Sequence, residues 1–244
     1  MRAGGTEGKS RAKSDLGVRL VSAIVMVAIA GTALAMGGWP LEIFVFLVGG
    51  GLIIEMVGLV RRFDMDSAGK ALWIAGGLVY ICAACASLLA MPGTVRWLII
   101  LMVIATDTGA YFAGRRFGGR KIAPAISPSK TWAGLYGGMT GATLVMVGAL
   151  FLILNALAAW GADGRSALDL MMERPVVIVV VIGIGCAVAV LAQAGDFLES
   201  WMKRRAGVKD SGKLIPGHGG LFDRVDGLLP VAIATGLMLW ATAA

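Results

Sequence analysis

Residues 195–227 read GDFLESWMKRRAGVKDSGKLIPGHGGLFDRVDG, and this charged stretch lies between two long apolar segments. It holds five of the chain's 15 acidic residues and its only histidine, His218. The 244-residue chain is 58% hydrophobic and only 15% charged, whereas a soluble domain has roughly 25% charged residues. Apolar runs of about 20 residues are typical of helices that cross a bilayer. We therefore expect an all-α integral membrane protein whose charged stretch carries the chemistry.

The apolar runs predict a bundle of about seven transmembrane helices. The first apolar run has a basic start and ends near Ala33-Leu34-Ala35, as a signal peptide does. We reject a signal peptide, because retaining this run as a helix makes the charges of successive loops alternate. The predicted spans are Leu20–Met36, Leu41–Val60, Ala71–Ala90, Val95–Gly114, Trp132–Ala158, Val176–Leu198 and Leu221–Thr242.

The distribution of Lys and Arg predicts the orientation of these spans. Alternate segments, counted from the N-terminal tail, contain 19 of the 22 basic residues, and the others contain three. Cytoplasmic loops of membrane proteins carry such an excess. We expect a cytoplasmic N-terminus, and both charged loops, 115–131 and 195–227, on the cytoplasmic side.

Three parts of the chain are expected from these patterns. Residues 1–19 form a basic cytoplasmic tail that we expect to be disordered, residues 20–94 form N-terminal transmembrane helices, and residues 95–244 form a catalytic transmembrane domain with cytoplasmic loops. Two small-x-x-x-small patterns, Gly134/Gly138 and Gly137/Gly141, mark the fifth span. They predict a close helix–helix contact, either within the chain or between the subunits of a homodimer.

Acidic residues inside the spans are candidates for function. Asp107 lies in the fourth span, where a carboxylate costs about 2.5–3.5 kcal/mol to insert; a purely structural pairing is the alternative. Glu55 lies deep in the second span, and its role stays open. Asp196, Glu199, Ser200 and Lys203 follow one another at i, i+3, i+4 and i+7 and so share a helix face. Asp196 and Ser200 could hold one cation, whereas Glu199 and Lys203 also fit an ordinary surface ion pair.

Two loops carry residues suited to phosphate. Ser127, Lys130 and Thr131 precede a predicted helix and could hold a phosphate, although a helix N-cap by Ser129 or Thr131 explains the hydroxyls equally well. The second loop opens with Lys209-Asp210 and ends with His218-Gly219-Gly220. Its glycines permit close backbone approach, and backbone N–H groups flanked by basic side chains suit a polyphosphate.

A pair of carboxylates follows the second loop. Asp223 and Asp226 flank Arg224 at the start of the last predicted span. Oxygen ligands of this kind suit Mg²⁺ bound together with substrate phosphates. A zinc site is not expected, because the chain has one histidine and no nearby cysteine.

These residues together resemble a known family. The run Ser200-x2-Lys203-Arg204-x4-Lys209-Asp210-x-Gly212-x2-Ile215-Pro216-x-His218-Gly219-Gly220-Leu221-x-Asp223-Arg224-Val225-Asp226 is similar to the signature of phosphatidate cytidylyltransferases. The resemblance extends to Asp107-Thr108-x-Ala110-Tyr111, to Ser127-Pro128-x-Lys130-Thr131 and to Gly195-Asp196-x2-Glu199-Ser200. It covers roughly the C-terminal 60% of the chain. Gly227, where the family more often has serine, departs from the pattern, and the chain is short for the family.

The resemblance implies an enzyme of a bacterial inner membrane that joins CTP and phosphatidate into CDP-diacylglycerol and pyrophosphate. It implies Mg²⁺ as a cofactor and a second cation such as K⁺ beside it. It does not imply a nucleic-acid partner. The implied metal ligands are Asp196, Ser200 and Asp223, and Asp226 or Asp107 is expected to support the site or to bind the second cation as a further metal ligand. The implied catalytic residues are Asp196, Asp223, Lys203, Arg224, Lys209 and Asp107. The implied substrate-binding residues are Ser127, Lys130, Thr131, Arg204, Asp210, His218, Gly219 and Gly220.

Two other functions fit part of the pattern. A CTP-dependent kinase of polyprenol or another lipid alcohol would use similar acidic motifs and metal. An ion-coupled transporter would use Asp107 and Asp196, but it would not explain the density of Lys, Arg and Gly in the loops.

Overall fold

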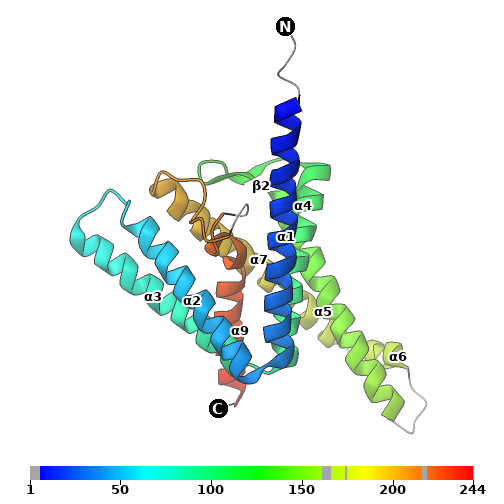
Figure 1. Cartoon of the computed structure of the whole chain (residues 1–244). Coiled ribbons are helices and arrows are strands. Elements are labelled where there is room, and N and C mark those ends of the chain that lie inside the picture. Colours follow the sequence, from blue (N-terminus) through cyan, green and yellow to red (C-terminus); the bar gives the residue numbers. More distant parts are fainter. Residues whose placement is uncertain (1–5, 161–165, 174, 216–218, 244) are drawn as a thin grey trace. The chain divides into compact units, whose positions relative to one another are not determined.

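A computed structural model describes residues 6–160, 166–173, 175–215 and 219–243. In chain order the elements are α1 (Thr6–Met36), α2 (Gly38–Val60), α3 (Ser67–Ala90), α4 (Gly93–Phe117), β1 (Lys121–Ala123), β2 (Ser127–Thr131), α5 (Trp132–Trp160), α6 (Ala167–Met172), α7 (Pro175–Arg205), α8 (Phe222–Val225) and α9 (Leu228–Ala243) (Figure 1). They fall into two compact units. Unit 1 comprises residues 1–89 and 202–225, and unit 2 comprises residues 90–201 and 226–244. The domain boundaries expected from the sequence stay a prediction.

The prediction of a helical membrane protein is confirmed. Six helices within the described ranges, α1 to α5 and α7, are long and apolar enough to cross a membrane. The shortest of them, α2, has 23 residues, which at the rise of an α-helix is about 34 Å, enough for the hydrocarbon core. The seventh predicted span corresponds in part to α9, which has 16 residues. The side on which each terminus lies stays a prediction.

Two boundaries differ from those expected. Helix α1 begins at Thr6, so the segment from there to residue 19 is helical rather than disordered. The predicted span Leu221–Thr242 is two helices, α8 and α9, with a break at Asp226-Gly227. At the break Asp226 Oδ1 accepts the N–H of Gly227 at 2.8 Å. A side chain that bonds the adjacent backbone in this way competes with the helical hydrogen-bond ladder.

Unit 1 is built on α2 and α3, which lie side by side (Figure 1). Asp66 caps α3 by accepting the N–H of Gly69 at 3.0 Å, and Lys70 donates to the carbonyl of Arg61 at 3.1 Å. Phe63 is fully buried beside this turn. Its ring packs edge-on against Trp73, and the guanidinium of Arg205 lies 5.6 Å from its centroid. The turn between α2 and α3 therefore contacts the last residue of α7.

Unit 2 is organised by the pairing of α4 with α5. Gly137, Gly138 and Gly141 of α5 lie directly against the backbone of α4 at Thr106, Gly109 and Ala105. A Cβ atom on Gly137 would overlap the side chain of Ala113 and the carbonyl of Gly109. The predicted glycine contact is therefore confirmed as a contact within the chain. It needs no second subunit, and the homodimer stays a prediction.

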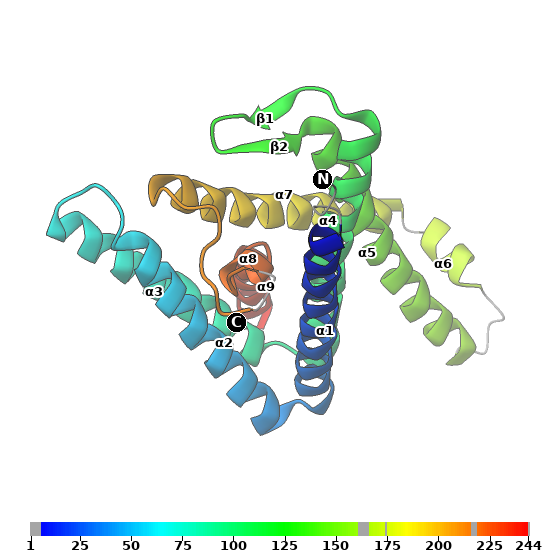
Figure 2. The same cartoon turned by 45° about the horizontal axis from the view of Figure 1, so that its top comes forward.

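A β-hairpin connects α4 to α5, where the sequence predicted only a loop. Strands β1 and β2 pair antiparallel, with Lys121 opposite Thr131 and Ala123 opposite Ser127, and the register shifts between these two pairs (Figure 2). Thr131 ends β2, and its Oγ1 accepts the N–H of Gly134 at 3.0 Å. This is the N-cap arrangement that the sequence left as an alternative. The hairpin thereby fixes where Lys130 projects at the start of α5.

Candidate active site

The predicted site residues are divided between the two units. Unit 1 contains Lys203, Arg204, Lys209, Asp210, Gly219, Gly220, Asp223 and Arg224, and unit 2 contains Asp107, Ser127, Lys130, Thr131, Asp196, Ser200 and Asp226. His218 lies outside the described residues. We describe the arrangement within each unit.

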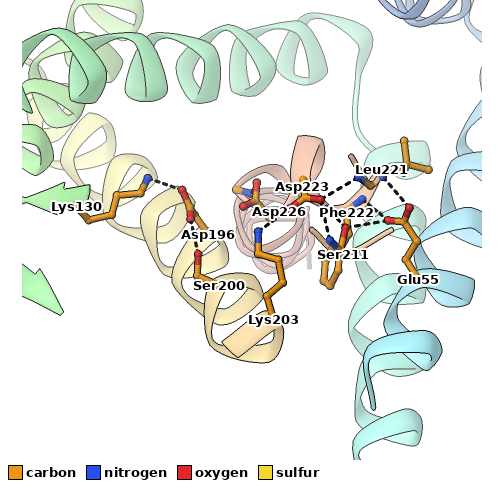
Figure 3. Close-up of polar contacts among 12 residues, drawn as sticks. Glu55, Lys130, Asp196, Ser200, Lys203, Ser211, Leu221, Phe222, Asp223 and Asp226 are labelled. Carbon is orange, nitrogen blue, oxygen red and sulfur yellow. Dashed lines mark hydrogen bonds and ion pairs between the residues drawn. The ribbon is translucent and has the colours of Figure 1, made fainter. Parts of the chain in front are cut away.

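Asp223 is the centre of the site in unit 1. It stands in the first turn of α8, where the helix dipole stabilises a negatively charged side chain. Its Oδ2 accepts three hydrogen bonds, from Ser211 N–H at 3.0 Å, Ser211 Oγ at 2.8 Å and Gly220 N–H at 3.0 Å. Its Oδ1 lies 2.5 Å from Lys203 Nζ (Figure 3). Both oxygens are thus engaged, and the carboxylate is held in one orientation.

Two described segments next to Asp223, residues 208–215 and 219–221, lie against each other. Ile215 N–H donates to the carbonyl of Gly219 at 3.1 Å, and Gly219 has a φ of 81°, which side chains other than glycine rarely adopt. A Cβ atom on Gly220 would collide with Ser211 Oγ. These glycines are required by the close approach that the sequence predicted for this loop.

Glu55 of α2 completes this cluster, and the sequence left its role open. It is only 5% exposed. Its Oε1 accepts Leu221 N–H at 3.0 Å, and its Oε2 accepts Phe222 N–H at 2.8 Å and lies 3.2 Å from Ser211 Oγ (Figure 3). Sequence reasoning missed Ser211 and left the role of Glu55 open. The available signal was a carboxylate deep in an apolar span.

An open pocket of about 750 Å³ adjoins this cluster within unit 1. It lies between α2 and the loop, and its lining includes the predicted residues Lys209 and Asp210 together with Arg62 and Lys213. Arg62 had not been predicted, because it lies at the end of α2, far from the motifs in the chain. Its lining carries these three cations and two carboxylates, Glu55 and Asp210, so a net positive charge remains to attract anions.

Arg204 and Arg224 are both exposed. Glu199, in contrast, is 1% exposed, and Lys203 faces Asp223. Glu199 is therefore not at the surface, as the alternative interpretation had it, whereas an ion pair between Glu199 and Lys203 stays a prediction. The reason is that α7 buries the side of its last turns that carries Glu199.

Asp196 is the centre of the site in unit 2. Its Oδ2 forms an ion pair with Lys130 Nζ, and its Oδ1 accepts a hydrogen bond from Ser200 Oγ at 3.2 Å (Figure 3). Ser200 follows one helical turn after Asp196 on α7, as the spacing predicted. Lys130 comes from β2. The segment Ser127–Thr131 therefore meets α7 through Lys130.

Replacing Lys130 with methionine should lower catalytic efficiency by about tenfold or more, which corresponds to about 1.4 kcal/mol of transition-state stabilisation. The change keeps most of the side chain's length but leaves Asp196 without its cation. The effect is measured as product formation from CTP and phosphatidate, the substrates that the sequence resemblance implies. Lys121→Met is the matched control, because Lys121 is exposed on the neighbouring strand β1. Equal rates for the two variants would contradict a role for the Lys130–Asp196 pair.

Two further carboxylates lie near Asp196. Burial, together with the charge of Asp196, raises the pKa of Asp226 to about 7, with a smaller increase from Asp107 and opposing effects of the Gly227 N–H and Lys130. A bound cation would reduce the electrostatic repulsion among these three carboxylates.

Ser127 and Thr131 are both buried, with 7% and 3% of their surfaces exposed. The Thr131 hydroxyl is occupied by capping α5. Ser127 Oγ lies 3.5 Å from Ser129 Oγ. Substrate binding by Ser127 and Thr131 stays a prediction, whereas their structural part in the hairpin is clear.

The carboxylate oxygens of Asp196 and Asp223 are of the type that Mg²⁺ prefers. Within the described ranges, no group of three or more His, Cys, Asp or Glu side chains is arranged to hold a metal ion. Each of the two carboxylates is paired with a lysine. The donor chemistry fits Mg²⁺, and the predicted ligand set of Asp196, Ser200, Asp223 and Asp226 stays a prediction.

The chain is similar in sequence to a known protein family and to individual proteins. The sequence model of the cytidylyltransferase family matches residues 90–242. The chain belongs to the cytidylyltransferase family. The enzyme named phosphatidate cytidylyltransferase in Brucella suis is 36% identical over 219 residues, covering 87% of this chain and 68% of the relative. The enzyme of that name in Rickettsia felis is 32% identical over 231 residues, covering 93% and 94%. Membership makes the chain a nucleotidyltransferase, and all the predicted site residues lie within the family match.

Proposed function

We propose that the chain is a phosphatidate cytidylyltransferase, which converts CTP and phosphatidate into CDP-diacylglycerol and pyrophosphate. The observation that carries the proposal is the Asp223 cluster, a carboxylate fixed by three donors and a lysine on a membrane-embedded scaffold. The names of the Brucella suis and Rickettsia felis relatives support the same substrates.

The proposed reaction is a single in-line displacement. A phosphate oxygen of phosphatidate attacks the α-phosphorus of CTP, the bond from that phosphorus to the oxygen bridging toward the β-phosphorus breaks, and pyrophosphate leaves with the bonding electrons. Such a transfer requires positioning and charge neutralisation rather than a side-chain nucleophile. Lys130, Lys203, Arg204, Lys209 and Arg224 supply positive charge, and Asp210, Gly219 and Gly220 with His218 hold phosphate or nucleotide in this proposal.

Mg²⁺ is part of the proposal, with Asp196, Ser200, Asp223 and Asp226 as its ligands and a second cation such as K⁺ beside them. When bound, it would neutralise the phosphates that approach one another. Asp107 would support this group of carboxylates.

Chelation of divalent cations with EDTA should lower product formation by at least about 100-fold, and added Mg²⁺ should restore it. The thermal unfolding midpoint should change little, because Asp196 and Asp223 already have lysine partners without the metal. Full activity in EDTA would contradict the metal assignment.

The active site is proposed to face the cytoplasm from the inner membrane of a bacterium. The support is the Lys and Arg distribution, 19 of 22 in alternate segments, which favours the cytoplasmic side, where CTP is present, for both charged loops.

The test is an assay of purified protein with CTP and phosphatidate in mixed micelles. The proposal predicts that pyrophosphate and CDP-diacylglycerol appear in equal amounts and that both require phosphatidate. A lipid-alcohol kinase would instead form CDP when a polyprenol is supplied, and an ion-coupled transporter would consume no CTP. Either result would reject the proposal.

A further inference from the structure

We propose that Glu55 is a positioning residue that holds the turn Gly220–Phe222, and through this turn Asp223, in the geometry that the reaction needs. The effect on catalysis rests on the proposed function, whereas the effect on the loop does not. Glu55 lies on α2, outside the family match at residues 90–242. The inference therefore assigns the N-terminal helices a part in the active site beyond crossing the membrane.

Two carboxylates, those of Glu55 and Asp223, accept the backbone N–H groups of three successive residues. Gly220 N–H donates to Asp223, whereas Leu221 and Phe222 donate to Glu55, at 3.0 and 2.8 Å. The carboxylates of Glu55 and Asp223 thus bind one continuous turn. Moving the Glu55 carboxylate would move the backbone that directly precedes Asp223.

Ser211 links the two carboxylates, and its hydroxyl hydrogen can be donated to only one of them at a time. Ser211 Oγ lies 2.8 Å from Asp223 and 3.2 Å from Glu55, so the shorter contact favours donation to Asp223. The two backbone N–H groups are therefore the main attachment of the loop to Glu55. This makes the Glu55 contribution separable from that of Ser211.

The packing around Glu55 shows that the loop is built onto the carboxylate. A Cβ atom on Gly212 would overlap Glu55 Oε1, and one on Gly220 would lie 2.7 Å from Oε2. Glycine at both positions lets the loop backbone approach the carboxylate. Leu221 N–H, Phe222 N–H and Ser211 Oγ all contact the Glu55 carboxylate, so the loop compensates its burial. A buried carboxylate that is satisfied by backbone donors fixes those donors in turn.

Glu55→Gln is the test, because glutamine keeps the size but has one acceptor oxygen. Its amide nitrogen would face a backbone N–H, donor against donor, and one of the two loop attachments would be lost. Glu42→Gln is the matched control, since Glu42 is exposed on the same helix. Hydrogen–deuterium exchange of Leu221 and Phe222 measures the hold on the loop, and steady-state kinetics measures its effect on catalysis.

The proposal predicts faster exchange at Leu221 and Phe222 in Glu55→Gln with unchanged exchange in α3. It predicts that kcat falls about 10- to 100-fold, while KM for each substrate stays within about threefold. The control should match the wild type in both measurements. Wild-type exchange and kcat in Glu55→Gln would overturn the inference. If wild-type protein made no CDP-diacylglycerol, the proposed function would fail, while the exchange result would still decide the role of Glu55.

Ser211→Ala keeps the inference testable if Glu55→Gln does not fold. It removes the hydroxyl link but leaves both backbone bonds to Glu55. Leu221 and Phe222 should therefore stay protected from exchange in this variant. Loss of their protection would show that Ser211, rather than Glu55, holds the turn.

Discussion

Replacing Asp223 with asparagine should lower CDP-diacylglycerol formation by about 100- to 1,000-fold, the range found when a preorganised electrostatic group is removed from an active site. Asp223 Oδ2 accepts three hydrogen bonds, and Oδ1 faces Lys203 Nζ. Asparagine can keep its oxygen toward only one of these two sets of donors. Its NH₂ group would then face either the Lys203 ammonium or the loop N–H groups, and the negative charge proposed to bind Mg²⁺ would be gone.

Asp64→Asn is the matched control for Asp223→Asn. Asp64 is exposed in the turn after α2, so the same chemical change there should leave the rate unchanged. The measurement is the initial rate of product formation at saturating CTP and phosphatidate, with size-exclusion chromatography to verify folding. A folded Asp223→Asn protein with more than about half of the wild-type rate would contradict the central place given to Asp223.

Replacing Gly137 with valine should destabilise unit 2 by about 1–3 kcal/mol or more, the cost of overpacking a tight contact. Any Cβ atom there would overlap Ala113 and the carbonyl of Gly109. The obstacle on α4 is largely backbone, which cannot rotate away as a side chain can. We expect a lower thermal unfolding midpoint in detergent and a reduced yield of monodisperse protein.

Gly148→Val on the same helix is the control for this prediction. A Cβ atom on Gly148 would have no neighbour within 4 Å, and valine costs little at a site open to lipid. Its unfolding midpoint should stay at the wild-type value. Equal midpoints for Gly137→Val and Gly148→Val would show that the close contact of α4 with α5 does not limit stability.

The sequence was most informative where the signal is local. Apolar runs of about 20 residues predict membrane helices because bilayer thickness sets their length. The spacing of Asp196 and Ser200 on α7 predicted their contact, because residues four apart share a helix face. The Gly137/Gly141 pattern predicted the tight pairing, and only the partner helix, α4, needed the structure.

The rest depended on contacts between segments far apart in the chain. Glu55 and Phe222 are 167 positions apart, and no pattern in α2 indicates which loop meets its carboxylate. The β-hairpin was missed because its strands are only three and five residues long, too short for a period-2 signal. The break at Asp226-Gly227 was missed because the span was predicted from an apolar run. Such a run indicates how far a helix extends, but it does not reveal a side chain that bonds the backbone within it.

The most direct test of the account is to follow the label from CTP into lipid. CTP labelled at the α-phosphate and CTP labelled at the γ-phosphate are incubated separately with phosphatidate and the purified protein. We predict α-label in the lipid product and γ-label only in pyrophosphate, because the lipid phosphate attacks the α-phosphorus. γ-Label in lipid, with CDP as the second product, would contradict the proposed reaction.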